Sequence, residues 1–248
     1  LHDIYEKSVR TAVKSGIRNL SNYLLYNFED KPEELYYRLE MNVKLCEELD
    51  ASIYSFPMKY HPINDPEFFM NRDYIGKHWN RKFIRAIQAI LNSTKGKIGR
   101  GKSFFEKAFG RDIEEYRKLL VMPEDMIIYR FFFDWLSLPK AKKIAKNLFN
   151  DTSICNYSTE KWWKTYCKCE KELPKKEWQN LQKVIFQNDY NSINLDNYSG
   201  LAKELLGFYI EHRKSKMEKG TDLYKMKVEY EKDPIQRAKR KHIYGREE

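Results

Sequence analysis

The sequence predicts a helix-dominated chain that opens with one strand–helix–strand (βαβ) unit. Two observations favour this fold class. Hydrophobic residues make up 42% and aromatic residues 15% of the 248 residues, which is enough apolar surface to build a core and argues against disorder. The same chain has only 10 Gly and 8 Pro, too few for a turn-dense all-β fold, so long helices are expected.

The first elements alternate between helix and strand. Apolar spacing predicts a helix over residues 4–14, and the short Leu- and Tyr-rich run 17–27 predicts a buried strand. A second helix is expected from Pro32, with Asp30 as its N-cap, because Pro is favoured in a first turn and Asp at a cap. Residues 51–56 predict the second strand.

Two parallel strands cannot form a stable sheet alone, because both of their edges stay open. More strands are therefore expected on the N-terminal side of this unit. The chain starts at Leu1 with a helix already under way, so we expect it to be cut from a longer protein.

Helical spacing dominates from residue 67 onward. Helices are expected over residues 79–92, 103–109, 111–121, 124–136, 139–149, 160–168, 174–188 and 199–218. The expected organisation is an α/β part over residues 1–66, a helical extension over 67–218 and a basic tail, extended or partly disordered, over 219–248.

Much of the net charge of +10 lies toward the carboxy-terminal end, because residues 213–246 hold 12 basic and 5 acidic residues. A basic cluster with tyrosines nearby can follow a phosphate backbone. A helical nucleic-acid-binding or interaction protein is therefore one alternative function. Its contacts would come from Arg237, Lys239, Arg240 and Lys241.

No signal peptide precedes the first helix, and the longest apolar run, 127–136, is too short to cross a bilayer. A soluble, cytoplasmic chain without membrane contacts is expected. The four cysteines, Cys46, Cys155, Cys167 and Cys169, offer no four-ligand zinc pattern, so they are expected to be reduced thiols and no metal site is expected.

Residues 96–103 match the P-loop pattern G-x-x-x-x-G-K-[ST], with Gly96, Gly101, Lys102 and Ser103 as the phosphate-binding positions. A P-loop needs a buried strand directly before it, and residues 83–92 have helical spacing instead. A nucleotide-binding protein is thus a second alternative, and a basic Gly-rich connector between two helices is the interpretation that the spacing favours.

The ends of the two predicted strands point to one common site. Both strands run into polar residues just before a helix or loop, and parallel α/β folds bind ligands at the carboxyl ends of strands. The first strand ends in Asn22, Tyr23 and Asn27, and the second in Phe56, Pro57 and Met58.

These two runs resemble late strands of radical S-adenosylmethionine (radical-SAM) barrels. The run NLSNYLLYNFEDKPEE over 19–34 is similar to a late strand with its following acidic helix start, and IYSFPMKYHPI over 53–63 is similar to the next strand. The stretches 108–110 (AFG) and 122–124 (MPE) resemble the helical extension of one bacterial subgroup. The resemblance covers about residues 1–135.

The resemblance implies an α/β remnant, one βαβ unit of a partial TIM-type barrel, followed by a mostly α-helical extension. It implies that Asn22, Tyr23 and Asn27 lie near the amino-acid or ribose end of S-adenosylmethionine. Three further residues would lie near its adenine: Phe56, Pro57 and Met58.

The C-x-x-x-C-x-x-C loop that holds the [4Fe–4S] cluster of that superfamily does not occur in this sequence. A parent protein with the loop would reductively cleave S-adenosylmethionine to a 5′-deoxyadenosyl radical. The resemblance therefore implies a carboxy-terminal portion of a radical-SAM-like oxidoreductase, whose partner is the missing N-terminal half of the barrel. This portion alone is expected to be inactive.

Overall fold

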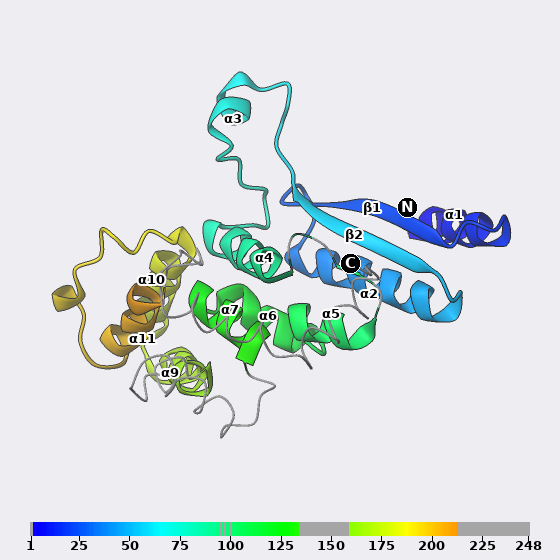
Figure 1. Cartoon of the computed structure of the whole chain (residues 1–248). Helices are drawn as coiled ribbons and strands as arrows, with labels where there is room; N and C mark the ends of the chain where they lie inside the picture. The colour runs from blue at the N-terminus through cyan, green and yellow to red at the C-terminus, as the bar shows by residue number, and fades with distance from the viewer. Residues whose placement is uncertain (1, 95, 97, 100, 134–158, 213–248) are drawn as a thin grey trace, which may run out of the picture. The chain divides into compact units, whose positions relative to one another are not determined.

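The computed structural model describes residues 2–94, 96, 98–99, 101–133 and 159–212 (Figure 1). These residues form two compact units. The first, which we call the strand unit, holds residues 2–79 and the described residues of 94–117, and the second, the helical unit, holds 80–93, 118–133 and 159–212. The expected domain boundary after residue 66 falls inside the strand unit.

The strand unit opens with the predicted βαβ arrangement. Helix α1 (His2–Lys14) leads into strand β1 (Asn19–Tyr26), and helix α2 (Pro32–Glu48) crosses over to strand β2 (Ser52–Lys59). The two strands pair in parallel, with register from Asn19 opposite Ser52 to Tyr26 opposite Lys59. The prediction of a helix-dominated chain with a small parallel sheet is confirmed for the part of the chain that the structure describes.

One face of this sheet, which we call the covered face, packs against both helices. A core cluster joins Val9 of α1 and Leu45 and Cys46 of α2 to Ile53 of β2. Asn42 of α2 donates from Nδ2 to Ser55 Oγ at 2.8 Å on the same face. Helices α1 and α2 therefore lie on the same side of the sheet.

Asp30 does not cap α2, contrary to the prediction. The N-cap position is Lys31, whose side chain makes no capping hydrogen bond, and Pro32 follows it. The Asp30 carboxylate instead accepts from Phe28 N at 2.9 Å and from Arg38 Nη2 at 2.7 Å. These donors draw the carboxylate away from the helix end, and Pro has no N–H there that a cap would need to satisfy.

A long connection leaves the end of β2 and carries the short helix α3 (Pro66–Asn71) (Figure 1). Asp65 caps α3 by accepting from Glu67 N at 3.1 Å, and Arg72 ends it in the left-handed conformation. Lys59 Nζ donates to Arg72 O at 2.8 Å, which fixes the far end of α3 to the end of β2.

Helix α5 (Lys102–Phe109) and residues 113–117 of helix α6 (Ile113–Val121) complete the strand unit. The buried Tyr36 ring packs at 5.1 Å from Phe105 and 5.3 Å from Tyr116, between ring centroids. Tyr116 also donates to Pro32 O at 3.0 Å, so the aromatic cluster fixes α6 to the start of α2.

The helical unit is built from α4 (Arg81–Thr94), α7 (Glu124–Phe133), α9 (Thr159–Glu172), α10 (Lys175–Gln187), the 3-10 turn η2 (Leu195–Asn197) and α11 (Gly200–Glu211). Its core is aromatic, with Trp162 and Tyr209 fully buried. Tyr209 donates to Val121 O at 2.6 Å, and both residues belong to this unit. The predicted helix 139–149 and the basic tail lie outside the described residues.

Candidate functional site

The face of the β1–β2 sheet that points away from α1 and α2 carries none of the described helices of the strand unit. We call it the open face. Its eight positions are Asn19, Ser21, Tyr23, Leu25, Ser52, Tyr54, Phe56 and Met58, the residues that alternate with the covered ones. None of them is Asp, Glu, Lys or Arg, although 33% of the whole chain is charged.

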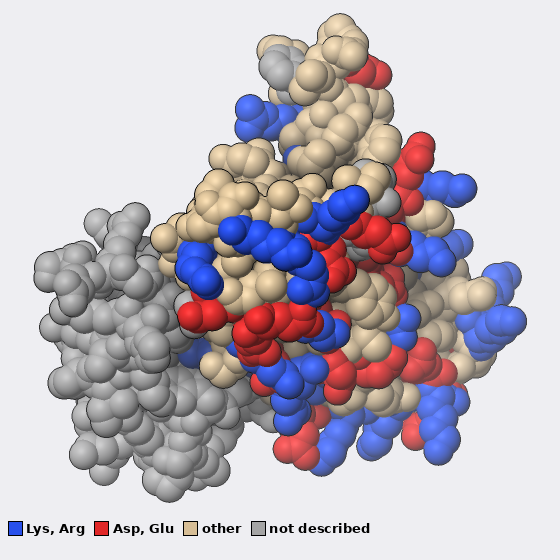
Figure 2. All heavy atoms as spheres, turned by 90° about the vertical axis from the view of Figure 1, so that its right-hand side faces the viewer, with Lys and Arg blue, Asp and Glu red and all other residues tan. Residues whose placement is uncertain are grey.

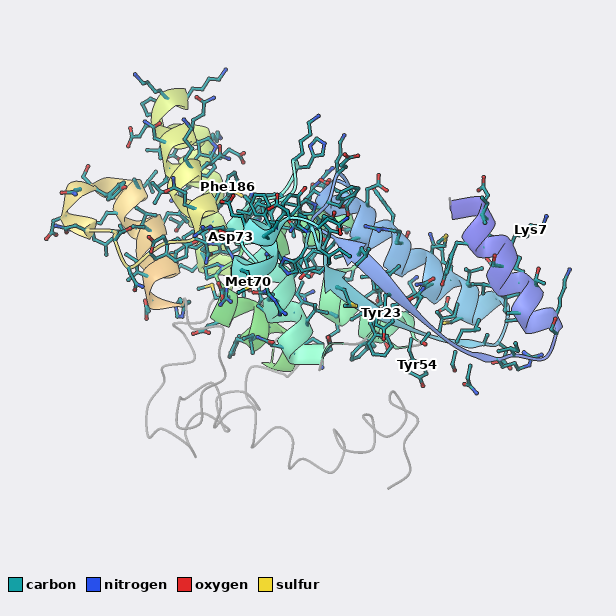
Figure 3. The ribbon with its side chains drawn as sticks, turned by 90° about the horizontal axis from the view of Figure 1, so that it is seen from above. Lys7, Tyr23, Tyr54, Met70, Asp73 and Phe186 are labelled. Atoms are coloured by element: carbon teal, nitrogen blue, oxygen red, sulfur yellow. The ribbon has the colours of Figure 1, made fainter. Side chains whose placement is uncertain are left out.

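Large side chains stand exposed on this face. Tyr23 is 71% exposed, Leu25 48% and Met58 46%. Tyr23 and Phe56 are opposite each other in the register, with ring centroids 5.7 Å apart, and Tyr54 lies beside Tyr23 along the strands (Figure 3). Parallel strands are normally covered on both faces, so this uncharged aromatic wall is the unusual surface of the strand unit.

The outer edges of the two strands differ. On β2, Ser55 exchanges two backbone hydrogen bonds with Ile98, at 2.9 and 2.8 Å, and Pro57 has no N–H to offer a further strand. Proline within a sheet is confined to edge strands, so β2 has the character of an edge.

On β1, the backbone hydrogen bonds Ser52 N to Arg18 O and Tyr60 N to Tyr26 O, both 2.8 Å, show that the even-numbered residues turn toward β2. The odd-numbered backbone groups of Asn19, Ser21 and Tyr23 therefore point away from it, because these groups alternate along a parallel ladder. They have no backbone partner among the described residues, so this edge of β1 is open.

The six residues that the resemblance assigned to S-adenosylmethionine do not share one surface in the structure. Tyr23, Phe56 and Met58 stand on the open face, whereas Asn22 and Pro57 lie on the covered face. Asn22 Nδ2 donates to the hydroxyl of Tyr5, whose pKa is raised by burial and partly lowered again by this hydrogen bond.

The sixth residue, Asn27, lies just past the end of β1 and is fully buried. Its side chain bonds to backbone groups of residues 60, 74 and 76 rather than facing the open sheet surface. Sequence reasoning could not find these partners, because two of them lie 47 and 49 residues away along the chain.

Aromatic rings collect where the two strands end. Phe28 and Tyr60 have ring centroids 4.6 Å apart, Tyr60 and Tyr74 5.6 Å, and Phe68 and Tyr74 5.4 Å. At these distances the rings pack directly on one another and leave no cage for a ligand between them. These packed rings form an aromatic cluster at the ends of the two strands. The sequence patterns did not predict this cluster.

The P-loop alternative lacks the element that it needs. Helix α4, not a strand, precedes Gly96, and it ends at Thr94. Gly101 then caps α5, and the Lys102 side chain is 69% exposed and lies 3.9 Å from Glu106. A phosphate-binding loop is held rigid by the strand before it, so the segment acts here as a connector between two helices.

The described cysteines are not grouped. Cys46 is buried beneath the covered face, where its Sγ accepts from Ile53 N at 3.2 Å. Cys167 and Cys169 lie on α9, and burial raises the pKa of Cys169 to about 11. Among the residues that the structure describes, no three His, Cys, Asp or Glu side chains are placed to hold a metal ion. Cys155 lies outside these residues.

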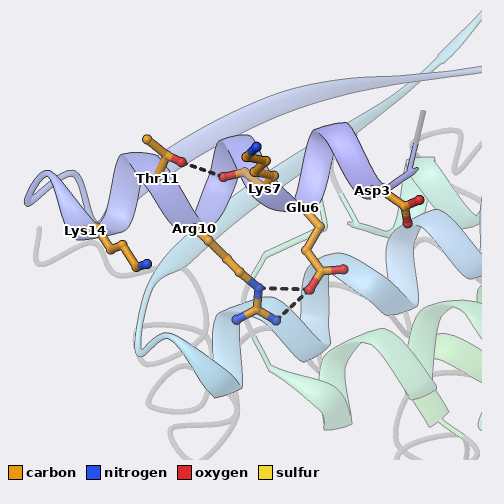
Figure 4. Close-up of a pocket in the computed structure, with 6 residues that line it drawn as sticks. All are labelled: Asp3, Glu6, Lys7, Arg10, Thr11 and Lys14. Atoms are coloured by element: carbon orange, nitrogen blue, oxygen red, sulfur yellow. Dashed lines mark hydrogen bonds and ion pairs between the residues drawn. The ribbon is translucent and has the colours of Figure 1, made fainter.

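Two surface hollows have mixed charge. One, of about 410 Å³, follows α1, where the Arg10 guanidinium bonds to Glu6 and to Glu48 (Figure 4). The other, of about 790 Å³, follows α9 and is lined by four Lys and three Glu side chains. Basic and acidic side chains also intermix over the face shown in Figure 2, which is typical of a solvated surface.

Four basic residues proposed for nucleic-acid binding, Arg237, Lys239, Arg240 and Lys241, lie outside the described residues. Within the described ranges, no helix combines the length and the apolar character needed to span a membrane.

Comparison of this chain with protein-family models, with curated proteins and with solved structures gives no match. The candidate site therefore depends on the geometry above, and the open face with its strand ends is the surface that this geometry singles out.

Proposed function

We propose that the strand unit is one wall of an α/β barrel that binds S-adenosylmethionine, in a radical-SAM-like iron–sulfur oxidoreductase. The observation that carries this proposal is the contrast between the two faces of the sheet. Both α1 and α2 cover one face, and the other face is uncharged, carries aromatic rings and is covered by no described helix of the strand unit. In an α/β barrel the helices lie outside and the other face of every strand lines the interior.

The composition of the open face favours a ligand-lined interior over packing against further helices. A sheet covered by helices on both sides reads as nearly continuous Val, Ile and Leu. The open face instead mixes Ser21, Ser52 and Asn19 with the rings of Tyr23 and Phe56. Small polar groups beside aromatic rings are what small-molecule sites use for orientation and contact area.

The open edge of β1 supports the same proposal. Further parallel strands would add at that edge, because β2 already has the character of an edge strand, with Pro57 and the Ile98 contact on its outer side. These strands would come from polypeptide outside the described residues, as the missing N-terminal half of the barrel.

The residues present fit the adenine end of S-adenosylmethionine. Adenine is planar and uncharged, and Phe56 and Met58 offer it an uncharged surface. Tyr23, which the resemblance assigns to the amino-acid or ribose end, stands opposite Phe56, so this proposal places its ring beside the adenine as well. Asn22 and Pro57 would support that surface from behind the strands. When bound beside a reduced iron–sulfur cluster, S-adenosylmethionine supplies a 5′-deoxyadenosyl radical.

The described residues do not fit the cluster itself. Cys46 is buried on the covered face and already accepts a backbone hydrogen bond, and Cys167 and Cys169 lie on α9. Cys46 thus faces away from the open side of the sheet, and among the described residues no three His, Cys, Asp or Glu side chains are placed to hold a metal ion. Cluster ligands would therefore have to come from outside the described residues.

The test is equilibrium dialysis of the full-length protein against labelled S-adenosylmethionine under anaerobic conditions. Tyr23→Ala and Phe56→Ala should each weaken binding about tenfold, because a lost base–aromatic stack costs about 1–3 kcal/mol. Tyr37→Ala is the matched control, since Tyr37 is also an exposed tyrosine, 47% exposed, but lies on α2. Equal binding by all three variants would contradict the proposed site.

A further inference from the structure

Asn27 fastens three chain segments together at the carboxyl end of the sheet. Its Nδ2 donates to Tyr74 O at 3.0 Å and to Tyr60 O at 3.4 Å, and its Oδ1 accepts from Gly76 N at 2.9 Å. The residue is fully buried and has a φ of 71°, a left-handed conformation that Asn tolerates better than most residues. The side-chain amide group and the side-chain carbonyl oxygen of Asn27 therefore all form hydrogen bonds with backbone groups.

Neighbouring contacts hold the same segments. Trp79 Nε1 donates to Asp30 O at 2.9 Å, just beyond the end of β1. Gly76 lies so close to β1 that a Cβ built on it would stand 2.1 Å from Phe28 O. The backbone of residues 74–79 is therefore seated directly against the turn that follows β1, with no room to slide.

The segment fixed in this way, residues 60–79, carries apolar side chains that face solvent. Ile63 is 76% exposed, Met70 77% and Ile75 37%. Figure 1 shows the segment leaving the end of β2 and holding α3 away from the sheet, and Figure 3 marks Met70. The segment that carries these side chains begins at the end of the sheet where α/β folds bind ligands.

We infer that Asn27 is a positioning residue, which holds segment 60–79 in place beside the ligand site at the carboxyl ends of β1 and β2. This inference rests on the proposed function, because it assumes that a ligand binds at those strand ends. Asn27 acts through the backbone of Tyr74 and Gly76 and does not touch the ligand.

The substitution that separates this role from a simple loss of stability is Asn27→Asp. An ionised carboxylate would face the carbonyl oxygens of Tyr60 and Tyr74, which repel it. A protonated carboxyl group can again donate to Tyr74 O while its second oxygen accepts from Gly76 N. The lost geometry should therefore return as the pH falls.

The measurement is S-adenosylmethionine affinity relative to wild type at pH 8 and at pH 5. We expect Asn27→Asp to bind at least about tenfold more weakly at pH 8 and to approach wild type at pH 5, whereas Asn27→Ala stays weak at both. Amide hydrogen exchange at Gly76, which does not depend on ligand, should accelerate in Asn27→Ala.

Val9→Ala is the control, because Val9 is buried in the core cluster on the covered face, away from the strand ends. It should lower stability while leaving ligand affinity and local exchange at Gly76 unchanged. If wild type does not bind S-adenosylmethionine, the proposed function fails. If wild type binds and both Asn27 variants bind equally well at pH 8, or if Gly76 exchange does not change, the positioning role is overturned.

Discussion

The covered and open faces of the same two strands differ in almost every property. On the covered face, Ile53 and Ser55 are 2% and 1% exposed, and two helices pack on them. Tyr54 and Phe56, which directly follow Ile53 and Ser55 in the sequence, lie on the open face and remain partly exposed. Tyr23, opposite Phe56 in the register, is 71% exposed. Side chains alternate between faces along a strand, so neighbours in sequence have entirely different surroundings.

This difference separates two roles within one sheet. The buried side chains of one face stabilise the fold, and the exposed side chains of the other face are available for binding. Residues of the covered face hold the strands to α1 and α2 and contribute stability. The large side chains Tyr23, Leu25 and Met58 of the open face are apolar or aromatic without being buried, so selection for a stable core does not explain them. An apolar residue that is exposed together with its neighbours indicates a binding surface.

The largest expected effect comes from the covered face. Ile53→Ala removes a side chain that is 2% exposed and packed in the core cluster with Val9, Leu45 and Cys46. The lost burial and the cavity should lower the free energy of unfolding by about 2–5 kcal/mol. Urea unfolding followed by circular dichroism measures this loss. A change below about 1 kcal/mol would mean that α1 and α2 do not hold the sheet as described.

Local sequence patterns predicted the helices and strands of this fold. They did not predict which face of the sheet is covered by helices and which is open. Pro32 and the apolar spacing after it predicted α2, and the Leu- and Tyr-rich run predicted β1. However, β1 carries Leu20 and Leu24 on one face and Tyr23 and Leu25 on the other. Because both faces are apolar, no alternation distinguishes the covered face from the open one.

The site was predicted less completely, for a physical reason. The sequence predicted a site at the strand ends and assigned Asn27 to the ligand. The structure instead shows the Asn27 side chain bonded to Tyr74 and Gly76, which lie in a loop far along the chain. Asp30 illustrates the same limit. A local capping rule predicted that its side chain caps α2. In the structure the Asp30 carboxylate instead accepts hydrogen bonds from Arg38 and from Trp79, which lies far along the chain.

A second contrast is between the uncharged polar side chains buried on the covered face and a charged side chain buried in the helical unit. The covered face buries amides and hydroxyls, whereas the helical unit buries Lys82, whose Nζ has no hydrogen-bond partner in the described part of the chain. The nearby Glu124 carboxylate is bound by Arg85 at 2.7 and 3.0 Å. Desolvation lowers the pKa of Lys82 to about 8, an effect opposed by Glu124 and reinforced by Arg85.

This lowered pKa predicts that stability rises with pH. Between the folded pKa of about 8 and the ordinary value of 10.5, the unfolded chain holds a proton that the folded chain has released. Raising the pH from 7.5 to 9.5 should therefore remove about 2 kcal/mol of destabilisation caused by Lys82. The raised pKa of Cys169 acts in the opposite direction from about pH 9, so the Lys82 contribution is obtained as the difference between wild type and a variant without this lysine. The window closes near pH 10, above which the raised pKa values of Tyr116 and Tyr209 act in the opposite direction.

The check is urea unfolding across this pH range for wild type and Lys82→Met. The variant should be more stable than wild type at pH 7.5, with a difference that shrinks toward pH 9.5. Lys44→Met serves as the control, because Lys44 lies on the exposed side of α2 and, among the described residues, pairs with the surface residue Glu40 at 2.9 Å. An identical pH dependence in wild type and Lys82→Met would show that Lys82 keeps an ordinary pKa.

The smallest expected effect on stability comes from the open face. Tyr23→Ser replaces a ring that is 71% exposed, so little burial is lost and the free energy of unfolding should change by no more than about 0.5 kcal/mol. The same variant should nevertheless reduce binding of a hydrophobic dye to the folded protein, because it removes the most exposed ring of the open face. Dye fluorescence and urea unfolding on one preparation measure both quantities. A loss of more than about 2 kcal/mol would place Tyr23 in a packed core, and the distinction between a stabilising face and a binding face would then fail.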